Sequence, residues 1–210
     1  MAQKAFIYGG GPVFADTVTE RPKAGDIVIA ADSGYKTAMD MAGRVDILVG
    51  DMDSIRDSIP DGTVEVQRLP AEKDLTDLQV AVELAIGRGA DELILVSSLS
   101  GRLDHTLSTL AILEDMNGRG IYALVTDGQN RARFIRSTST LIARSQYKYL
   151  SLIAADELVK GVSIEGCKYP LQKAKLCRQV QFAVSNEITG NVALISVRKG
   201  GLYIIESMDR

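Results

Sequence analysis

Four short apolar segments, each followed by Gly, Ser or Asp, most constrain how the first half of this chain can fold. They are Lys4–Tyr8, Asp26–Ala31, Asp46–Val49 and Glu92–Val96. Short segments with apolar residues at nearly every position are typical of strands in a parallel sheet that is covered on both faces. The first half is therefore predicted to contain a buried parallel sheet.

Helix-like segments lie between these predicted strands. Each of the two clearest, Thr76–Arg88 and Asp104–Asn117, places apolar residues three and four positions apart, which predicts one buried stripe per helix. The expected stripes are Leu78, Ala81, Val82 and Ala85 in the first helix, and Leu107, Leu110 and Ala111, with Glu114 at the edge, in the second. Gly118 and Gly120 mark the predicted end of the second helix. Alternating strands and helices indicate an α/β domain of Rossmann-like type.

The pattern changes after Asp127-Gly128, where strand-like segments follow one another with little helix between them. These segments are Arg133–Ile142, Tyr147–Ala154, Val159–Glu165, Val180–Val184, Val192–Arg198 and Leu202–Glu206. Lys199–Gly201 is predicted to form a hairpin turn. Short strands at this spacing favour an antiparallel sandwich or barrel. We therefore expect an α/β domain over residues 1–130 and an all-β sandwich domain over residues 131–210.

Charge and composition argue against several classes of partner. The chain carries 24 basic and 27 acidic residues, a net charge of -3, whereas proteins that bind nucleic acids usually have a basic surplus. No segment reaches the roughly 18–20 apolar residues of a membrane-spanning helix, and the first apolar run is too short for a secretory signal. Cys167 and Cys177 do not make a disulfide framework. We expect a cytoplasmic protein with no nucleic-acid or membrane partner.

Charged residues follow the predicted strands at the edge where an open α/β sheet binds its ligands. Asp32 ends one strand, Asp51 and Asp53 follow another, Asp74 and Asp77 open a helix, and Arg102, Asp104 and His105 follow Glu92–Val96. Because the carboxyl ends of parallel strands share one edge, we expect these residues to converge on one site.

Asp51 and Asp53 lie two positions apart, so in an extended segment their carboxylates point the same way. Two such carboxylates suit magnesium, which prefers oxygen ligands and retains waters or substrate phosphates. Gly50 lets the backbone approach closely. The alternative is a polar turn in which Asp53 caps a neighbouring segment.

The segment Glu72–Asp77 also has two interpretations. Thr76 or Asp74 caps the following helix while Asp77 complements its dipole. Alternatively, Lys73 holds a phosphate and Asp77 provides another metal ligand. Nothing in the local sequence separates the two.

Arg102 has the fork geometry for bidentate contact with phosphate, and the alternative is a surface pair with Asp104. His105 is the only histidine, which excludes His-rich zinc sites. No G-x-x-x-x-G-K-[ST] motif occurs, so the chain is not a P-loop enzyme. Gly9–Gly11 follows the first strand but is a weak nucleotide signal by itself.

Five motifs together resemble the thiamine pyrophosphokinase family: ADSG at 31–34, VGDMDSI at 49–55, EKDLTDLQ at 72–79, SGRLDHTL at 100–107 and VSNEITG at 184–190. The resemblance covers nearly the whole chain. It implies a nucleotide-binding α/β domain, a C-terminal β-sandwich and a homodimer with thiamine held between its subunits.

The resemblance also implies a role for each matching residue. Asp51, Asp53 and Asp77 match the family's magnesium ligands, and Asp32 and His105 match residues of its thiamine and catalytic pocket. Lys73 and Arg102 look like phosphate contacts. Ser185 and Asn186 match the segment that reaches thiamine. Tyr169 lies where some relatives place a tryptophan against thiamine, and this chain has no tryptophan. The alternative for Tyr169 is a half-buried sandwich residue beside Pro170. Other members carry Gln where His105 stands.

The implied reaction transfers a diphosphoryl group from ATP to the thiamine hydroxyl, with magnesium as cofactor, and releases AMP. Positioning and charge neutralisation supply most of the catalysis in such transfers. Either Asp74 or Asp104 accepts the hydroxyl proton. The rival predictions are another magnesium-dependent kinase or nucleotide hydrolase on a similar scaffold, or a non-catalytic sensor of thiamine or nucleotide.

Overall fold

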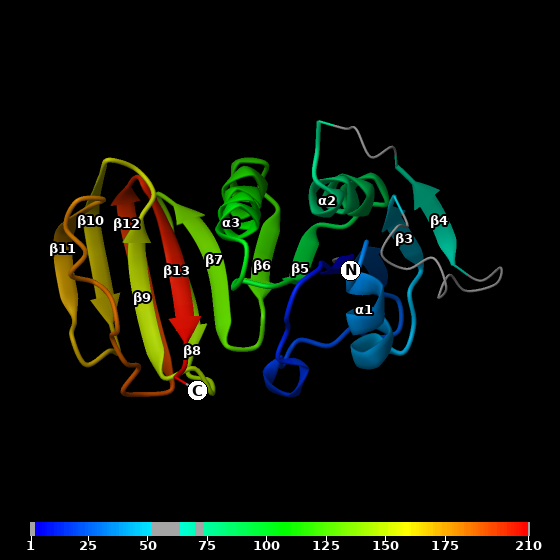
Figure 1. Ribbon diagram of the computed structural model, residues 1–210. Coiled ribbons are helices and arrows are strands. Elements are labelled where there is room, and N and C mark those ends of the chain that lie inside the picture. The colour runs from blue at the N-terminus through cyan, green and yellow to red at the C-terminus, as the bar shows by residue number, and fades with distance from the viewer. Residues whose placement is uncertain (1–2, 52–63, 70–73, 210) are drawn as a thin grey trace. The chain divides into compact units, whose positions relative to one another are not determined.

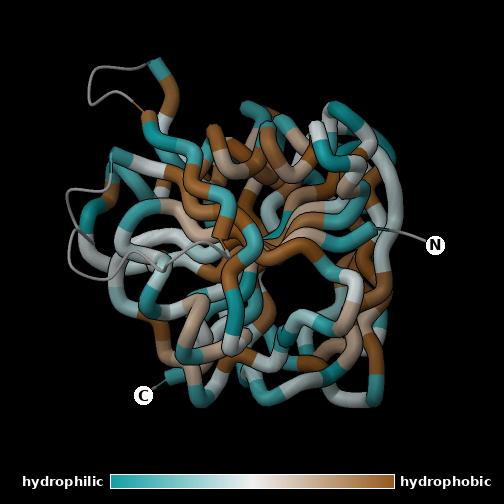
Figure 2. The backbone as a smooth tube through the Cα atoms, turned by 90° about the vertical axis from the view of Figure 1, so that its right-hand side faces the viewer, coloured by the Kyte–Doolittle hydropathy of each residue, from teal (hydrophilic) through white to brown (hydrophobic). Residues whose placement is uncertain are grey.

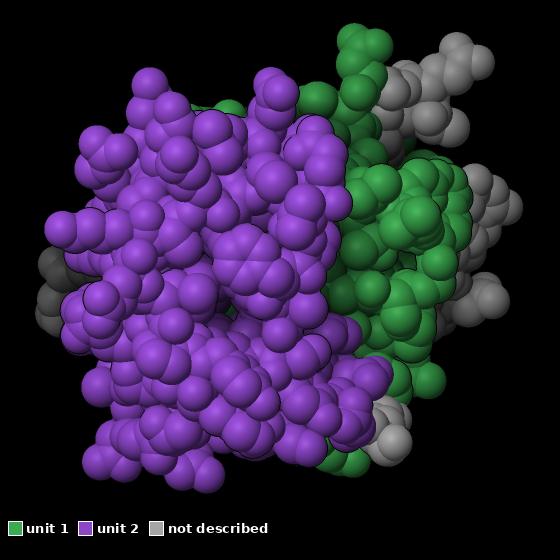
Figure 3. All heavy atoms as spheres, turned by 90° about the vertical axis from the view of Figure 1, so that its left-hand side faces the viewer, with its two compact units in different colours: residues 1–128 green, residues 129–210 purple. Residues whose placement is uncertain are grey.

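The computed structural model describes residues 3–51, 64–69 and 74–209. The chain divides into two compact units, Met1–Gly128 and Gln129–Arg210, which Figure 3 colours separately. The predicted domain boundary lies between residues 130 and 131, and the structural division lies between residues 128 and 129. None of the helices in the described ranges combines the length and the apolar character needed to cross a membrane.

Unit 1 is built on a parallel sheet (Figure 1). In sheet order, its described strands are β4 (Glu65–Arg68), β3 (Ile47–Gly50), β2 (Ile27–Ala31), β1 (Lys4–Tyr8), β5 (Glu92–Val96) and β6 (Tyr122–Thr126). Every neighbouring pair in this run is parallel. The predicted parallel sheet is confirmed, and its four predicted strands correspond to β1, β2, β3 and β5.

Both faces of this sheet are covered. Phe6 and Tyr8 of β1 pack in one core cluster with Ala38 of α1 (Gly34–Ala42). Ala5 and Ile7, whose side chains point to the opposite face, are also fully buried. Figure 2, which views the molecule from the side of unit 1, shows hydrophobic residues running through these strands and helices. A sheet buried on both faces explains why its strands are apolar without alternation.

Two further helices complete unit 1: α2 (Asp77–Gly87) and α3 (Leu103–Gly118). The buried residues of α2 are Ala81, Val82 and Ala85, three of the four in the predicted stripe, and the fourth, Leu78, is half-buried. The predicted stripe of α3 is wrong, because Leu107 is 59% exposed and the buried residues are Thr109, Ile112, Leu113 and Met116. Apolar residues occur on more than one side of α3, and packing against β6 selects the buried side. The prediction also omitted α1, β4, β6 and a 3-10 turn at Ala15–Thr17.

Unit 2 contains two antiparallel sheets. One has the order β7 (Asn130–Arg136), β13 (Gly201–Ser207) and β9 (Tyr149–Ala154). The other has the order β11 (Leu171–Cys177), β10 (Leu158–Glu165), β12 (Val192–Lys199) and β8 (Ser139–Ala143). Buried residues from both sheets, among them Leu152, Val162 and Ile195, form one core cluster. The predicted all-β sandwich is confirmed.

Three details of the predicted strands in unit 2 are wrong. Arg133–Ile142 is not one strand, because Ser137, with a φ of 50°, turns the chain between β7 and β8. Val180–Val184 forms no strand, whereas Leu171–Cys177 does, although its alternating lysines and glutamine are mostly exposed. Lys199–Gly201 is not a hairpin turn, because β12 and β13 pair within different sheets and Gly200 forms a corner between them.

A buried ion group ties the first strand of unit 2 to its last. The Glu206 carboxylate is almost fully buried and accepts hydrogen bonds from the guanidinium of Arg131 at 2.6 and 2.9 Å and from that of Arg133 at 2.6 Å. Arg131 also stacks 4.9 Å from the ring centre of Tyr147. A buried carboxylate is tolerable only with such partners, so the three residues depend on one another.

Replacing Glu206 with alanine is therefore expected to destabilise the fold strongly. Two guanidinium groups would remain in a poorly solvated site without their counter-charge, which costs about 3–5 kcal/mol in comparable cases. Urea unfolding of the whole chain measures this loss. Glu157→Ala, at an exposed position, serves as the control and is expected to stay within about 0.5 kcal/mol. Equal stability of the two variants would show that the ion group contributes little.

Candidate active site

The order of the strands creates a crevice in unit 1. β1 lies between β2 and β5, and the chain reaches β5 only after passing through β4 and α2. At such a reversal of strand order, the connections leave the carboxyl ends in opposite directions and leave room for a ligand. A cavity of about 490 Å³ opens here. Its lining comprises Gly9–Pro12, Ala31–Ser33, Thr76–Leu78, Ser97, Ser98, Ser100–Arg102, His105, Ser108 and Thr109.

The glycine turn after β1 is packed too tightly to carry side chains. A Cβ atom on Gly9 would lie 2.5 Å from the Ser97 Oγ, and one on Gly10 would lie 2.5 Å from the Ser33 Oγ. Real Cβ atoms do not approach other atoms so closely, so a side chain on either glycine would force the neighbouring serine hydroxyl to move, and at Gly9 the Ser97 Cβ, 3.0 Å away, is crowded as well. The turn consequently presents bare backbone to the cavity, as close approach to a ligand requires.

Asp32 lines the cavity because of the backbone around it. It follows β2 with a φ of 49°, and its backbone N–H donates to the Val49 carbonyl oxygen at 2.7 Å. A Cβ atom on Gly50, whose φ is 148°, would lie 3.3 Å from the Asp32 Cα, so this glycine lets β3 end beside Asp32. Asp51 follows directly and is exposed. Asp32 lines the cavity, and Asp51 occupies the adjoining strand end.

Asp77 is held at the cavity by the cap of α2. The Thr76 Oγ1 accepts a hydrogen bond from the Gln79 backbone N–H at 3.2 Å, and the Gln79 side chain accepts one from the Thr76 N–H at 3.1 Å. Of the two predicted caps, Thr76 is therefore the one that forms this capping box. The cap fixes Asp77 in the first helical turn, where it also lines the cavity. Asp74 is exposed and is not among the lining residues.

Arg102 and Asp104 form a fork-to-fork ion pair at the start of α3. The two guanidinium-to-carboxylate distances are 2.6 and 3.2 Å. This hydrogen bonding to Arg102 lowers the pKa of Asp104 to about 2. The predicted surface pair is thus present, while Arg102 also lines the cavity together with His105. A carboxylate with so low a pKa is a poor proton acceptor, which disfavours Asp104 as a base while the pair persists.

The predicted magnesium ligands are only partly within the described residues. Asp53 and Lys73 lie outside them. Over residues 3–51, 64–69 and 74–209, no group of three or more His, Cys, Asp and Glu side chains is arranged to hold a metal ion. Asp32 and Asp77 do line one cavity, and carboxylate oxygens are the donors that magnesium prefers. The donor chemistry fits, and the set of Asp51, Asp53 and Asp77 stays a prediction.

The remaining predicted residues gather in unit 2. The buried Asn186 side chain accepts a hydrogen bond from the Tyr169 N–H at 3.0 Å and donates one to the Tyr169 carbonyl oxygen at 2.8 Å. Ser185 has a φ of 56°, and its N–H donates to the Ser151 Oγ. The Tyr169 side chain is 58% exposed. Asn186 therefore positions Tyr169, whose exposed ring has the Lys168 Nζ 5.5 Å from its centre.

Sequence reasoning missed the hydroxyl groups of the cavity. Ser33, Ser97, Ser98, Ser108 and Thr109 all line it. Two of these serines follow β5 directly in the run Ser97-Ser98, and Ser33 follows Asp32. For Ser33, Ser97 and Ser98, the position after a predicted strand was the available signal, the same one that pointed to the carboxylates, whereas Ser108 and Thr109 lie within α3.

These features define a class of protein: a doubly wound α/β unit with its ligand cavity at the strand reversal, followed by an antiparallel β unit. Comparisons with known proteins narrow the class. Residues 20–124 match the model of the thiamin pyrophosphokinase catalytic domain. Residues 138–202 match the model of the thiamin pyrophosphokinase vitamin B1 binding domain.

Individual relatives agree with these models. The chain is 29% identical to the thiamine pyrophosphokinase of Bacillus subtilis over 187 residues, which are 86% of this chain and 87% of the relative. The crystal structure of a Bacillus subtilis thiamine pyrophosphokinase superposes with a TM-score of 0.87 at 26% identity, over 99% of this chain and 100% of the other. That of Geobacillus thermodenitrificans thiamin pyrophosphokinase gives 0.84 at 27% identity, over 99% and 98%. The chain belongs to the thiamin pyrophosphokinase family.

Close packing at the cavity predicts that Gly34→Ala destabilises the protein. A Cβ atom at this first residue of α1 would lie 2.1 Å from the Tyr8 carbonyl oxygen, so β1 and α1 would have to separate. We expect a loss of about 1–3 kcal/mol, as for other overpacked sites. Gly118→Ala is the control, because a Cβ atom there meets nothing within 4 Å and alanine favours a helix. Urea unfolding of both variants decides, and an unchanged Gly34→Ala would contradict the packing argument.

Proposed function

We propose that this protein catalyses diphosphoryl transfer from ATP to the hydroxyl group of thiamine, giving thiamine diphosphate and AMP. The observation that carries the proposal is the cavity at the strand reversal, where a side-chain-free glycine turn lies beside Asp32, Asp77 and Arg102. Membership of the thiamin pyrophosphokinase family supports the same reaction.

The cavity residues suit the handling of phosphate groups. The backbone of Gly10 and Gly11 and the neighbouring serine hydroxyls provide hydrogen-bond donors without bulk. Arg102 and Lys73 would offset the phosphate charge that magnesium leaves uncompensated. Asp51, Asp53 and Asp77 would hold magnesium, which supplies neutralisation of the phosphate oxygens when it is bound. Such transfers depend on positioning and charge more than on covalent help from the protein.

Proton removal from the thiamine hydroxyl is assigned to Asp74 or Asp104. The ion pair with Arg102 offers a way for Asp104 to become a better base when substrate binds. If Arg102 turns from Asp104 to a substrate phosphate, the carboxyl group loses the hydrogen bonds that keep its pKa near 2. Its pKa then rises, and the carboxylate becomes a better base. Phosphate binding would thus prepare the proton acceptor.

Thiamine is assigned to the cluster formed by Tyr169, Ser185 and Asn186. The exposed Tyr169 ring offers a flat face for stacking, and Asn186 fixes the backbone that carries it. We further propose a homodimer with thiamine between its subunits. Support comes from the exposed apolar side chains of Val180, Phe182 and Val184, which precede Ser185. The free thiols of Cys167 and Cys177 support a reducing compartment such as the cytoplasm.

Product analysis tests the reaction. The purified protein, incubated with ATP, magnesium and thiamine, is expected to form thiamine diphosphate and AMP in equal amounts. Chromatography of both products decides the matter. ADP in place of AMP would indicate a monophosphoryl kinase, ATP consumption without thiamine would indicate a hydrolase, and binding without turnover would indicate a sensor.

Removing a predicted metal ligand should abolish most of the activity but keep the fold. Asp77→Ala and Asp53→Ala are each expected to lower the rate at least about 10²-fold, the scale of losing one preorganised electrostatic group. Asp91→Ala, which removes an exposed carboxylate just before β5 and away from the cavity lining, is the control. Rates at saturating substrate and circular dichroism are compared. Near-normal turnover in either variant would remove that residue from the site.

A further inference from the structure

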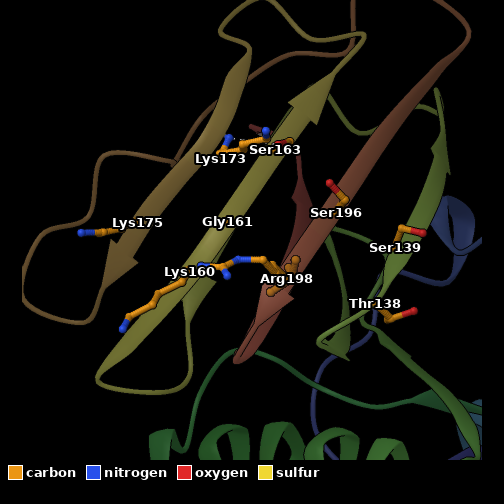
Figure 4. Close-up of a pocket in the computed structure, with 10 residues that line it drawn as sticks. Thr138, Ser139, Lys160, Gly161, Ser163, Lys173, Lys175, Ser196 and Arg198 are labelled. Atoms are coloured by element: carbon orange, nitrogen blue, oxygen red, sulfur yellow. Dashed lines mark hydrogen bonds between the residues drawn. The ribbon is translucent and has the colours of Figure 1, made fainter.

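A second cavity, of about 740 Å³, lies on the outer face of the four-stranded sheet in unit 2 (Figure 4). Its lining brings together cationic and hydroxyl side chains from four neighbouring strands and the turn before one of them. These residues are Thr138, Ser139, Lys160, Gly161, Ser163, Lys173, Lys175, Ser196, Val197 and Arg198. None of these ten residues is acidic, although the whole chain carries a net charge of -3.

The positive charges of this cavity lie at positions where they repel one another. Lys160 of β10 stands directly opposite Lys175 of β11 in the strand register. Like charges at directly opposed positions destabilise a sheet. No ion pair in the described part of the chain involves Lys160, Lys175 or the neighbouring Arg198. A bound anion would turn this repulsion into attraction.

The backbone is shaped to gather these groups. A Cβ atom on Gly161 would lie 2.7 Å from the Arg198 Cβ and 3.2 Å from its Nε, so the arginine stem passes directly over the glycine. Gly161 has a φ of 68° and falls where the register between β10 and β11 shifts. Such a bulge redirects side chains. Here it brings Lys160 and Arg198 to the same hollow, as Figure 4 shows.

A second irregularity lies on the facing strand. Lys173 of β11 has a φ of 49°, which is costly for a residue with a side chain. Its backbone N–H donates to the Ser163 Oγ at 3.0 Å across the strands. Lys173 lies beside the second register shift, between Val162 and Ile164. Two distorted positions on adjacent strands border one cationic hollow, and backbone strain of this kind clusters at ligand sites.

We propose that this cavity binds a small organic anion that carries two or more linked phosphate groups. Lys160, Lys175 and Arg198 supply the charges, and Arg198 provides the bidentate fork that matches phosphate oxygens. The hydroxyl groups of Ser139 and Ser196 stand on the other side of the hollow in Figure 4 and can receive the rest of the ligand. The volume lies within the range of about 300–1,000 Å³ typical of small-molecule sites. A single sulfate-sized monoanion would leave much of it unfilled.

This site is independent of the proposed reaction, because all of its residues belong to unit 2 and none lines the cavity of unit 1. An enzyme that consumes one polyphosphate and produces another meets ligands of this class continually. Either proposal therefore survives the failure of the other.

Amide NMR on the intact protein in magnesium-free buffer tests the proposal. Separate titrations use inorganic pyrophosphate, ATP and thiamine diphosphate. We expect saturable shifts at the amides of Gly161, Lys173 and Ser196 with at least one of the three. A response to pyrophosphate shows that the linked phosphates suffice, and a response only to ATP or to thiamine diphosphate identifies the organic part that the hydroxyl side receives.

Variants of the lysine pair sharpen this test. Lys160→Ala/Lys175→Ala is expected to weaken the binding that these amides report at least about tenfold, the scale of losing charge-assisted hydrogen bonds. Lys148→Ala is the control, because it removes an exposed charge of the same unit from a residue that neither lines the cavity nor stands opposite one of its lysines. No saturable shift at the cavity amides with any of the three probes, or equal weakening in control and double variant, would overturn the proposal. So would a response to an oligonucleotide or to anionic vesicles alone.

Discussion

The close contact between the glycine turn after β1 and the ends of β2 and β5 is the constraint on which the catalytic unit depends. It exists because the chain reverses strand order around β1, which opens the sheet edge at one place. Gly9 and Gly10 fill the opening so tightly that serine hydroxyls take the space where their side chains would be. With this turn in place, Asp32 and Asp77 line one cavity from β2 and α2. The site is thus a product of topology first and of charged residues second.

In unit 2, buried polar side chains hold irregular segments against a regular sandwich. The buried carboxylate of Glu206 joins β7 and β13 through two arginines, and Asn186 ties the turn at Tyr169 to the segment that follows Ser185. Both arrangements give buried polar groups hydrogen-bond partners, as their burial requires. The register shifts in the four-stranded sheet are a further irregular feature. They bring together cationic side chains that a flat sheet would have separated.

Those parts of the fold and site that depend on hydrophobic periodicity or on the residues at strand ends could mostly be predicted from the sequence. The buried strands of unit 1, the helix with its Thr76 cap and the change to an all-β unit all have local signals, and each was found. The buried side of α3 could not be predicted, since its apolar residues surround it and β6 decides which of them are covered. β11 was missed because its lysines resemble a solvent-exposed loop. Lys199–Gly201 looked like a hairpin, and only the pairing of β12 and β13 in different sheets reveals a corner. The serines of the cavity were overlooked because hydroxyl groups carry no charge signature.

The hydrogen bonds of Asn186 have one consequence for how the sequence of such a protein can evolve. Its amide group bonds to the main chain of Tyr169 and Glu187 and not to the tyrosine ring, so the backbone of the turn holds its shape whatever ring the turn displays. The aromatic ring can then be replaced without a change in the backbone that carries it. Exchange of one flat ring for another alters what is touched at that point and leaves the sandwich beneath it undisturbed, which makes this position a natural place for relatives to diverge.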